Sequence, residues 1–169
     1  DWYQRQLRRW SRNFAETATQ SIPAMDKLGE WLQENMPEDD ETRIAHGDYR
    51  MGNVMFHPTE PRIVAVFDWE ISTLGHPLGD LSYNTLIWYG PPFDGGMATL
   101  GGEQPAIAGV PSLRDYLAGY QAKSGQDMGT DVRFYKAYTM FRLACIYQGI
   151  IGRVRDGTAA NPHAGELAA

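Results

Sequence analysis

The chain has 169 residues, 43% of them hydrophobic, and this length fits one domain with a single sizeable core. Its formal net charge is −6, and its basic residues form no run apart from four arginines near the N-terminal end, so nucleic acid is not expected as a partner. We find neither a signal peptide nor an apolar run long enough to span a bilayer, and we therefore expect a cytoplasmic protein that binds no membrane.

Two helices are predicted before the first distinctive motif. The first covers residues 2–18, because apolar residues recur there at helical spacing: Tyr3, Leu7, Trp10 and Phe14. We interpret the arginines on its other face as solvated rather than as a binding patch: Arg5, Arg8, Arg9 and Arg12. Ser21 followed by Pro23 indicates the start of a second helix, which ends before Pro37.

A short strand over residues 43–45 leads into the most distinctive stretch of the sequence. Residues 46–53 read His-Gly-Asp-Tyr-Arg-Met-Gly-Asn. Asp48 and Asn53 have four residues between them, which is the spacing of an acid and an amide in kinase catalytic loops. This loop is the main candidate for chemistry in the chain.

The loop is followed by a predicted antiparallel hairpin. Residues 54–56 are apolar, a turn-rich segment follows, and residues 63–67 form a β-branched run. The residue that enters the first strand of a hairpin and the residue that leaves the second lie at the same end. This topology brings Asn53 and Asp68 together, with Asp48 one loop away.

Two acids and an amide at the mouth of a hairpin supply the hard oxygen ligands that suit Mg²⁺. Phosphoryl transfer needs Mg²⁺ to neutralise the nucleotide phosphates and a carboxylate to accept the proton of the attacking hydroxyl. Asp48 would be that base, and Asn53 and Asp68 the metal ligands. The alternative is a surface turn with ordinary capping residues, since Asp and Asn are frequent there. The two halves of the motif in order favour the metal site.

The sequence His-Gly-Asp, four residues, Asn, followed by Asp-Trp-Glu at residues 68–70, resembles the aminoglycoside phosphotransferase and choline kinase family, which has a protein-kinase-like fold. Residues 75–81 resemble that family's Gly-Asp-Pro-x-x-Asp-Leu segment, with His76 in place of the usual Asp. The sequence of residues 46–53, together with Phe-Arg-Leu-Ala at residues 141–144, is most similar to the branch found fused to acyl-CoA dehydrogenases. The likeness covers about residues 3–157.

The resemblance implies an α+β, mainly helical fold: the C-terminal lobe of a kinase-like phosphotransferase, with a small β-hairpin at the active cleft. It implies transfer of the γ-phosphate of ATP or GTP to a hydroxyl of a small molecule, with an aminoglycoside-, choline- or hydroxyacyl-like acceptor. Asp48 would be catalytic, and Asn53 and Asp68 would hold Mg²⁺ and, through it, the nucleotide. His46 and Asp80 would be structural supports of the loop. The acidic net charge would suit a cationic acceptor, although solubility alone also explains it.

Several neighbouring residues remain open from the sequence alone. Arg50 could meet a phosphate or an anionic substrate, and equally a salt bridge to Asp80 or Glu70. Trp69 is expected to pack beneath the metal loop. Glu70 could assist the metal, but a solvated or paired acid is the simpler reading. The other histidines, His57 and His76, have no partner at metal-ligand spacing and are taken as ordinary.

The remaining elements are helical and are separated by a long loop. A helix is predicted to begin at Asp80 and to stop at Gly90. Residues 90–111 form a Gly- and Pro-rich segment, which is either a functional lid or mobile. Ser112 opens a capping box for the next helix, which closes near Gly125.

A last long helix is predicted to be capped by Asp131 and to bury an aromatic stripe. Cys145, the single cysteine, lies within that stripe and is expected to be an inert core thiol. Residues 158–169 are expected to be a flexible tail, after a catalytic lobe over residues 1–157.

A kinase-like enzyme also needs a strand lysine for the α- and β-phosphates, its partner Glu and a loop over the nucleotide. The three lysines here, Lys27, Lys123 and Lys136, all fall in predicted helices. We therefore expect that the N-terminal nucleotide lobe is absent from this chain, that the fragment alone is inactive, and that the surface left by that lobe could bind a second copy. Two alternatives stay open: a catalytically silent pseudokinase-like interaction module, and a metal-dependent hydrolase that uses His46, Asp48 and Asp68.

Overall fold

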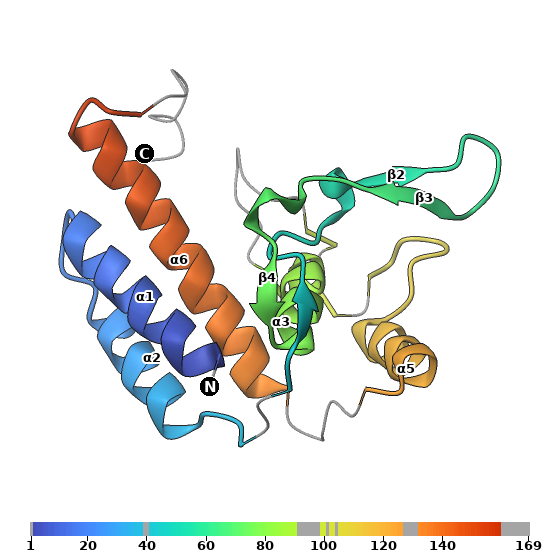
Figure 1. The fold of residues 1–169 in the computed structure, drawn as a ribbon, viewed down its shortest axis with the longest axis horizontal. Coiled ribbons are helices and arrows are strands. Elements are labelled where there is room, and N and C mark those ends of the chain that lie inside the picture. The colour runs from blue at the N-terminus through green and yellow to red at the C-terminus, as the bar shows by residue number, and fades with distance from the viewer. Residues whose placement is uncertain are drawn as a thin grey trace.

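The computed structural model describes residues 2–38, 41–90, 99–100, 102–103, 105–126 and 132–159. Within these residues the fold is mainly helical, as predicted, and it carries two small sheets of two strands each, of which one is the predicted hairpin. Figure 1 shows helices α1, α2 and α6 packed side by side, with the sheets, α3 and α5 on the opposite side of α6. The bounds of the three packed helices are Trp2–Thr17 for α1, Pro23–Glu34 for α2 and Arg133–Arg155 for α6.

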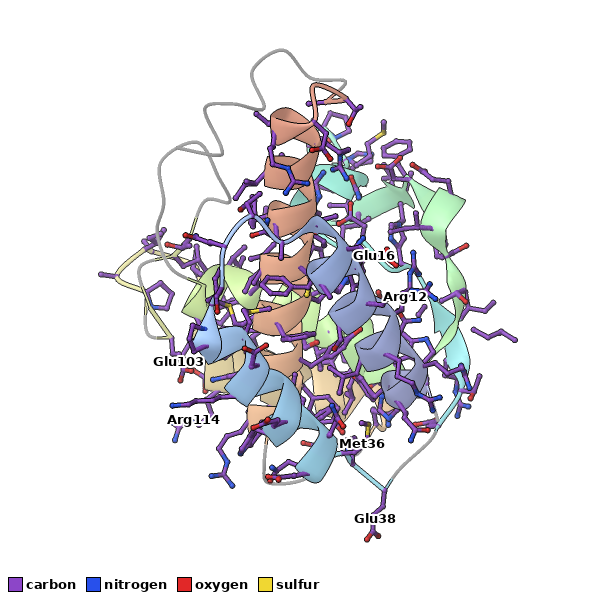
Figure 2. All side chains as sticks on the ribbon, turned by 90° about the vertical axis from the view of Figure 1, so that its left-hand side faces the viewer. Arg12, Glu16, Met36, Glu38, Glu103 and Arg114 are labelled. Carbon is purple, nitrogen blue, oxygen red and sulfur yellow. The ribbon has the colours of Figure 1, made fainter. Side chains whose placement is uncertain are left out.

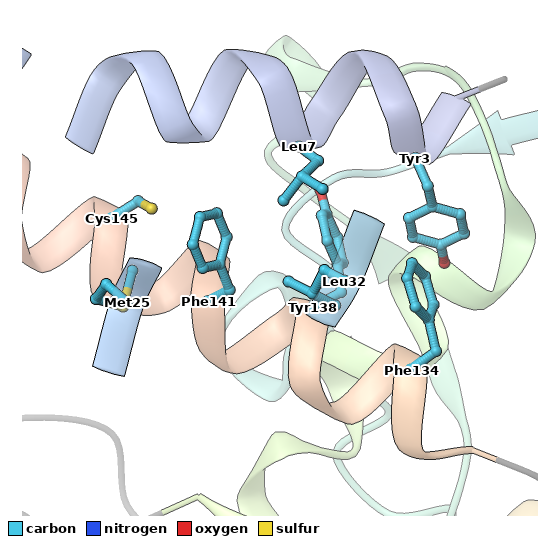
Figure 3. Packing of buried hydrophobic residues seen from close by; sticks show 8 residues of the cluster. All are labelled: Tyr3, Leu7, Met25, Leu32, Phe134, Tyr138, Phe141 and Cys145. Atoms are coloured by element: carbon cyan, nitrogen blue, oxygen red, sulfur yellow. The ribbon is translucent and has the colours of Figure 1, made fainter. Parts of the chain in front are cut away.

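The largest core cluster lies where α1 and α2 pack against α6 (Figure 3). Its buried members come from all three helices: Tyr3, Leu7, Met25, Leu32, Phe134, Tyr138, Phe141 and Cys145. Burying each large apolar side chain contributes about 1.5–3 kcal/mol, so this cluster holds the three helices as one body. The predicted apolar stripes of α1 and α6 are confirmed, and Cys145 is a buried free thiol whose pKa burial raises to about 12.

The outer face of α1 carries the arginines. Figure 2 shows Arg12 and Glu16 on this face, where their side chains lie 3.8 Å apart and are 77% and 67% exposed. Such an exposed pair contributes little to stability. Arg5, Arg8 and Arg9 are also exposed, in agreement with a solvated face, and Arg9 in addition lines the edge of a cleft that is described below.

Both sheets are antiparallel. The predicted hairpin is confirmed: β2 (Val54–Phe56) pairs with β3 (Ile63–Val66), with Val54 opposite Val66, and Figure 1 shows it extending from the lobe. The second sheet pairs β1 (Arg43–Ala45) with β4 (Thr73–Gly75), and β4 was not predicted. Three residues that read Thr-Leu-Gly are too few for a two-residue period to be recognised. The strand exists because its pairing with β1 satisfies its backbone.

The 3-10 turn η1 (Met51–Asn53) stands before the hairpin, and η2 (Trp69–Ile71) stands after it. The turn η1 therefore leads into the first strand of the two-stranded ribbon, and η2 follows the second strand. Because the ribbon is antiparallel, both turns lie at its open end, beside the predicted catalytic loop.

The helix predicted to begin at Asp80 begins three residues earlier and is interrupted. α3 covers Pro77–Asn84 and α4 covers Leu86–Tyr89. His76, expected to be an ordinary connector residue, is fully buried, and its Nδ1 accepts a hydrogen bond of 3.2 Å from the Leu78 amide as the cap of α3. At the break, the Thr85 hydroxyl donates to backbone carbonyls of the preceding turn, which competes with helix continuation.

The capping box is confirmed at α5 (Leu113–Ser124), where Ser112 Oγ accepts a hydrogen bond of 3.1 Å from the Asp115 amide and Gly125 closes the helix at φ 68°. The predicted cap Asp131 lies outside the described residues, and α6 begins at Arg133. Most of the predicted tail, residues 160–169, also lies outside them.

The loop over residues 90–111 is described only in part, without residues 91–98, 101 and 104. Hydrogen bonds and an ion pair fasten its described part to the helices at several points. The Leu100 amide donates to Ile87 O, Lys136 Nζ pairs with Glu103, and the Trp88 indole N–H donates to Pro111 O. Among the described helices, none combines the length and apolarity that a membrane span requires.

The buried tyrosines predict a loss of stability at alkaline pH. Burial raises the pKa of Tyr138 to about 12, above its ordinary value near 10. The neutral phenol is thus favoured in the folded state, so this stabilisation is complete below pH ~10 and disappears as pH rises towards ~12. Urea unfolding at pH ~8, ~10 and ~11.5 should show the free energy of unfolding falling, by up to about 2–3 kcal/mol for Tyr138 alone.

Tyr138→Phe is the matched control, because it keeps the ring and removes the ionisable group. Its free energy of unfolding should fall less steeply with pH than that of the unaltered chain. A residual fall is expected because burial also raises the pKa of Tyr89 to about 12. Identical pH dependence of the two proteins would contradict the assignment to Tyr138.

Candidate active site

The loop between β1 and η1 is fixed by the ring of His46. Its Nε2 lies 2.6 Å from Phe67 O and its Nδ1 accepts a hydrogen bond of 3.2 Å from the Asp48 amide. The acceptor at Nε2 is a carbonyl, so the proton of the neutral ring is on Nε2. His46 is almost fully buried, and the Trp69 ring packs against it at 4.7 Å between centroids. Both ring nitrogens are therefore used to join the Asp48 loop to the end of β3.

The carboxylate of Asp80 anchors the same loop from α3. Its Oδ2 accepts a hydrogen bond of 2.6 Å from the His46 amide, and its Oδ1 accepts one of 2.8 Å from the Gly47 amide. Gly47 has φ 85°, where a Cβ would lie 3.1 Å from Ile71 O, so the turn requires glycine. The two amides point at one carboxylate, which sets the direction in which the chain reaches Asp48.

Asp48 and Asn53 are in direct contact. Asn53 Nδ2 donates to Asp48 Oδ2 and to Asp48 O, both at 2.9 Å. Because both partners are acceptors, the amide nitrogen must face them, and Oδ1 of Asn53 then points elsewhere. Within the described residues that Oδ1 accepts no hydrogen bond. Asn53 is 5% exposed, whereas the Asp48 side chain is 24% exposed and can be reached from solvent.

Asp68 lies at the end of the hairpin that adjoins this pair. Its predecessor Phe67 donates its amide to Asn53 O at 2.8 Å and accepts from His46. Asp68 is exposed and has φ 67° and ψ 47°, the single positive φ of a residue other than glycine in the described chain. Left-handed backbone costs energy in most residues but is tolerated by Asp. The gathering of all three side chains around a common point stays a prediction.

Arg50 and Trp69 both contact the loop that carries Asp48. Arg50 Nε lies 3.3 Å from Asp48 Oδ2, and Arg50 makes no salt bridge to Asp80 or Glu70 among the described residues. The Trp69 ring packs against His46, as expected of a residue beside the loop, while its indole N–H donates to Val66 O at 2.9 Å and the residue remains 49% exposed. Glu70 is exposed, as its simpler reading predicted.

A cleft of about 640 Å³ opens beside Asp48, between the loop that carries Asp48 and helices α1 and α6. This volume is in the range of small-molecule sites. Two acids line it, Asp48 of the loop and Asp80 of α3. The other lining residues include arginines and aromatic side chains: Arg9, Trp10, Arg50, Tyr83, Tyr138 and Arg142.

Two cleft residues that the sequence analysis did not assign to the site contact the loop or its acid. Arg142 Nη2 donates to Gly47 O at 2.6 Å, across 95 positions of sequence. Burial, followed by the charge of Asp48 and a hydrogen bond to it, raises the pKa of Tyr83 to about 12. Tyr83 therefore stays protonated at neutral pH and donates towards Asp48. In the sequence, the sign that Arg142 could belong to the site is its position as a lone arginine within the apolar stripe of the last helix.

Removing the anchor of the loop should loosen it. Asp80→Asn is expected to destabilise the chain by about 1.5–3 kcal/mol, because an amide cannot accept both backbone N–H groups as a charged carboxylate does. It should also accelerate hydrogen exchange at residues 46–49. Urea unfolding and amide hydrogen exchange measure these two effects.

The matched control is Asp115→Asn, because Asp115 also lies in the first turn of its helix, α5. Both substitutions remove the same favourable interaction with a helix dipole, and only one removes an anchor of the loop. Equal changes in stability and exchange in the two variants would show that the Asp80 hydrogen bonds do not hold the loop.

Comparisons with known proteins show which family the chain resembles. Residues 1–120 match the model of the phosphotransferase enzyme family. Acyl-CoA dehydrogenase family member 11 of Mus musculus is 40% identical over 158 residues, which are 90% of this chain and 20% of that protein. Family member 10 of Mus musculus is 34% identical over 161 residues, which are 95% of this chain and 15% of that protein.

A solved structure from Ralstonia eutropha, assigned as an aminoglycoside phosphotransferase, superimposes with a TM-score of 0.88 at 45% identity. The match covers 99% of this chain and 51% of that one. The chain thus spans about half the length of this structural relative and at most a fifth of the two mouse proteins. The predicted fold class, a mainly helical α+β lobe of the phosphotransferase type, is confirmed.

The family model covers well over half of the chain. The sequence resemblance to aminoglycoside phosphotransferases, and to the branch related to acyl-CoA dehydrogenases, is confirmed by relatives of both kinds. The chain belongs to the phosphotransferase enzyme family.

Proposed function

We propose that this chain is the catalytic lobe of a small-molecule kinase, which transfers the γ-phosphate of ATP or GTP to an alcohol. The observation that carries the proposal is the Asp48–Asn53 pair, whose Asp48 lines a cleft and lies on a loop fastened by His46 and Asp80. Kinase chemistry depends on positioning and charge stabilisation, and a loop fixed from several sides supplies the positioning.

In this proposal Asp48 orients the acceptor hydroxyl and takes its proton. Its carboxylate is partly exposed towards the cleft, which is where an acceptor would approach. A base must come within hydrogen-bond reach of the proton that it removes. His46 does not fit this role, because both of its ring nitrogens already bond to the protein.

The residues at the hairpin mouth fit Mg²⁺. The orientation of Asn53 leaves Oδ1 available, and Asp68 follows the strand that is bonded to Asn53. An amide oxygen and carboxylates are the hard donors that Mg²⁺ prefers. The bound ion would neutralise charge on the nucleotide phosphates. The left-handed backbone at Asp68 supports this assignment, because strain of that kind gathers at functional sites.

The parts of the site that bind the rest of the nucleotide are proposed to lie on another segment of a longer protein. Lys27, Lys123 and Lys136 lie in α2, α5 and α6, and Lys136 pairs with Glu103, so none occupies a strand in the manner of a kinase lysine. The match of this chain to about half of the Ralstonia structure supports such a division.

The two sheets, together with the 3-10 turns η1 and η2 beside them, also carry many exposed apolar side chains. Ten large hydrophobic residues from Ile44 to Leu74 are between 43% and 74% exposed, including Met51, Phe56, Phe67 and Ile71. Soluble monomers rarely expose so many apolar groups together. We propose that the same further segment covers this surface, and that the isolated chain self-associates through it.

The alternatives are less well supported. A hydrolase that used His46 as a ligand would have to break one of its two loop hydrogen bonds. A pseudokinase-like module is disfavoured because the base and the metal donors of our proposal are all present. The acceptor is a finer question: the names of the relatives point to aminoglycosides on one side and to acyl thioester chemistry on the other.

Two assays test the function. Residues 1–169 alone should bind MgATP weakly and release no ADP with alcohols, because adenine and two phosphates lack most contacts and the site is open to water. The same chain joined to its nucleotide-binding segment should release ADP in the presence of an acceptor. Micromolar MgATP affinity or turnover by residues 1–169 alone would show that the further segment is not needed. Size-exclusion chromatography of both forms tests the self-association.

A further inference from the structure

Two guanidinium groups line the cleft beside Asp48 without a carboxylate partner among the described residues: Arg9 from α1 and Arg142 from α6. The guanidinium carbon of Arg9 lies 5.4 Å from the centre of the Trp10 ring. That of Arg142 lies 5.7 Å from the same ring and 5.0 Å from the Tyr83 ring. The Trp10 ring thus joins the two cations in one wall of the cleft.

Arg142 is held in place, but not all of its N–H donors have partners within the described chain. One N–H of Nη2 donates to Gly47 O, and the two aromatic rings fix the plane of the group. A guanidinium has five N–H donors, and those of Arg142 that do not reach Gly47 have no hydrogen-bond partner within the described chain. The side chain is half-buried. A positioned cation with spare donors is suited to a carboxylate or phosphate, which it binds in a two-pronged manner.

The acids of the cleft do not offset these cations. Asp48 is already paired with Arg50 and accepts a hydrogen bond from Asn53. Asp80 has each of its carboxylate oxygens on a backbone amide. The described lining of the cleft holds three arginines and two acids, so its formal charge is positive, although the chain as a whole carries −6.

The rest of the wall is apolar. It includes aromatic and aliphatic side chains from the first and last helices: Trp2, Tyr138, Leu143, Ile146 and Ile150. An acceptor that fills this space therefore meets hydrocarbon as well as charge. The guanidinium of Arg142 and the carboxylate of Asp48 both border the space, and Gly47, which Arg142 contacts, is the neighbour of Asp48.

We propose that Arg9 and Arg142 determine acceptor specificity by binding an anionic group of the alcohol whose hydroxyl reaches Asp48. The acceptor class is then an alcohol with a carboxylate or phosphate and an apolar chain between the two ends, and not a polycation. This inference rests on the proposed function for the role of the hydroxyl, while the binding of the anion does not depend on it. It replaces the expectation of a cationic acceptor that the net charge suggested.

The test uses the full chain and four six-carbon alcohols that differ in the group at the far end. They are ω-hydroxyhexanoate, hexanediol monophosphate, ω-hydroxyhexanamide and ω-aminohexanol. Trp10 lies against both arginines, so tryptophan fluorescence reports binding without nucleotide. At least one anion should bind tenfold or more tightly than the amide, and the amine should bind most weakly. The better of the two anions identifies the carboxylate or the phosphate as the natural group.

Arg9→Gln and Arg142→Gln should each weaken binding of the preferred anion by roughly 10- to 100-fold and leave binding of the neutral amide nearly unchanged. Arg8→Gln is the matched control, because Arg8 is an exposed neighbour on α1 outside the cleft lining. Arg142→Lys keeps the charge without the planar fork and should retain part of the affinity. Arg9→Gln keeps the test decisive if Arg142→Gln disturbs the loop.

Equal or absent binding of the four probes, or equal effects of Arg9→Gln and Arg8→Gln, would overturn the inference. Phosphate transfer from MgATP is scored separately. Anion binding that depends on both arginines, without transfer, would leave the inference standing and count against the proposed kinase. Transfer to ω-aminohexanol that is unaffected by Arg9→Gln would support the kinase and overturn the inference.

Discussion

Asp48→Asn is expected to lower phosphate transfer by about 100- to 10,000-fold while leaving the affinity for MgATP nearly unchanged. The amide has the shape of the carboxylate and retains an oxygen, so the loop that His46 and Asp80 hold should keep its form. What is lost is the group that accepts the proton in the transition state, and a loss of that kind appears in kcat rather than in ground-state binding. Single-turnover kinetics and calorimetry with MgATP measure the two quantities, in a protein that carries this chain and the nucleotide-binding segment.

Asp26→Asn serves as the control, because Asp26 is an exposed acid of α2 away from the cleft beside Asp48. It should change neither quantity. Near-normal turnover of Asp48→Asn, with the chemical step shown to limit the rate, would refute the role of Asp48. A loss of MgATP affinity that equals the loss of rate would instead point to Asp48 as a metal ligand.

The sequence was sufficient for the central part of this site because its contacts are set by local topology. An antiparallel hairpin must bring its two ends together, so the proximity of Asn53 to the end of β3 followed from the order of the strands. The contact between Asp48 and Asn53 spans five positions of one loop. Turn chemistry was equally local at Ser112 and Gly125, and those predictions were confirmed.

The sequence could not supply the contacts that depend on packing between distant elements. β4 is too short to show a pattern, and it becomes a strand only where β1 lies beside it. His76 caps α3 because the aromatic core around Tyr3 encloses it, and no spacing rule makes histidine a preferred cap. Arg142 reaches Gly47 because α6 packs against α3, whose Asp80 holds the loop.

The net charge of the chain likewise does not describe the charge of the cleft. The sum over the chain is −6, which would suit a cationic acceptor but is equally explained by solubility. The described lining of the cleft holds only three arginines and two acids, and both acids already bond to other groups of the protein. Which charges remain available to a ligand depends on these pairings, and net charge contains no record of them.

Removing the Asp68 side chain is expected to abolish Mg²⁺-dependent nucleotide binding, in contrast to the Asp48 substitution. Asp68→Ala removes the proposed metal ligand, but it also places alanine at φ 67°. Alanine has a Cβ and no side-chain oxygen to bond locally, so this left-handed backbone costs it about 1–2 kcal/mol. Asp68→Gly removes the same ligand where glycine is unstrained. Calorimetry with ATP, in the presence and absence of Mg²⁺, measures the effect in the protein with its nucleotide-binding segment.

The two variants separate the metal from the strain. Both should lose the Mg²⁺-dependent part of the affinity, while only Asp68→Ala should be less stable towards urea. Glu70→Gln is the control, because Glu70 is an exposed acid two positions away. If Asp68→Gly bound MgATP normally, Asp68 would not be a metal ligand, and the left-handed turn would be a structural feature alone. If Glu70→Gln also lost Mg²⁺-dependent nucleotide binding, Glu70 would be a metal ligand in addition to Asp68.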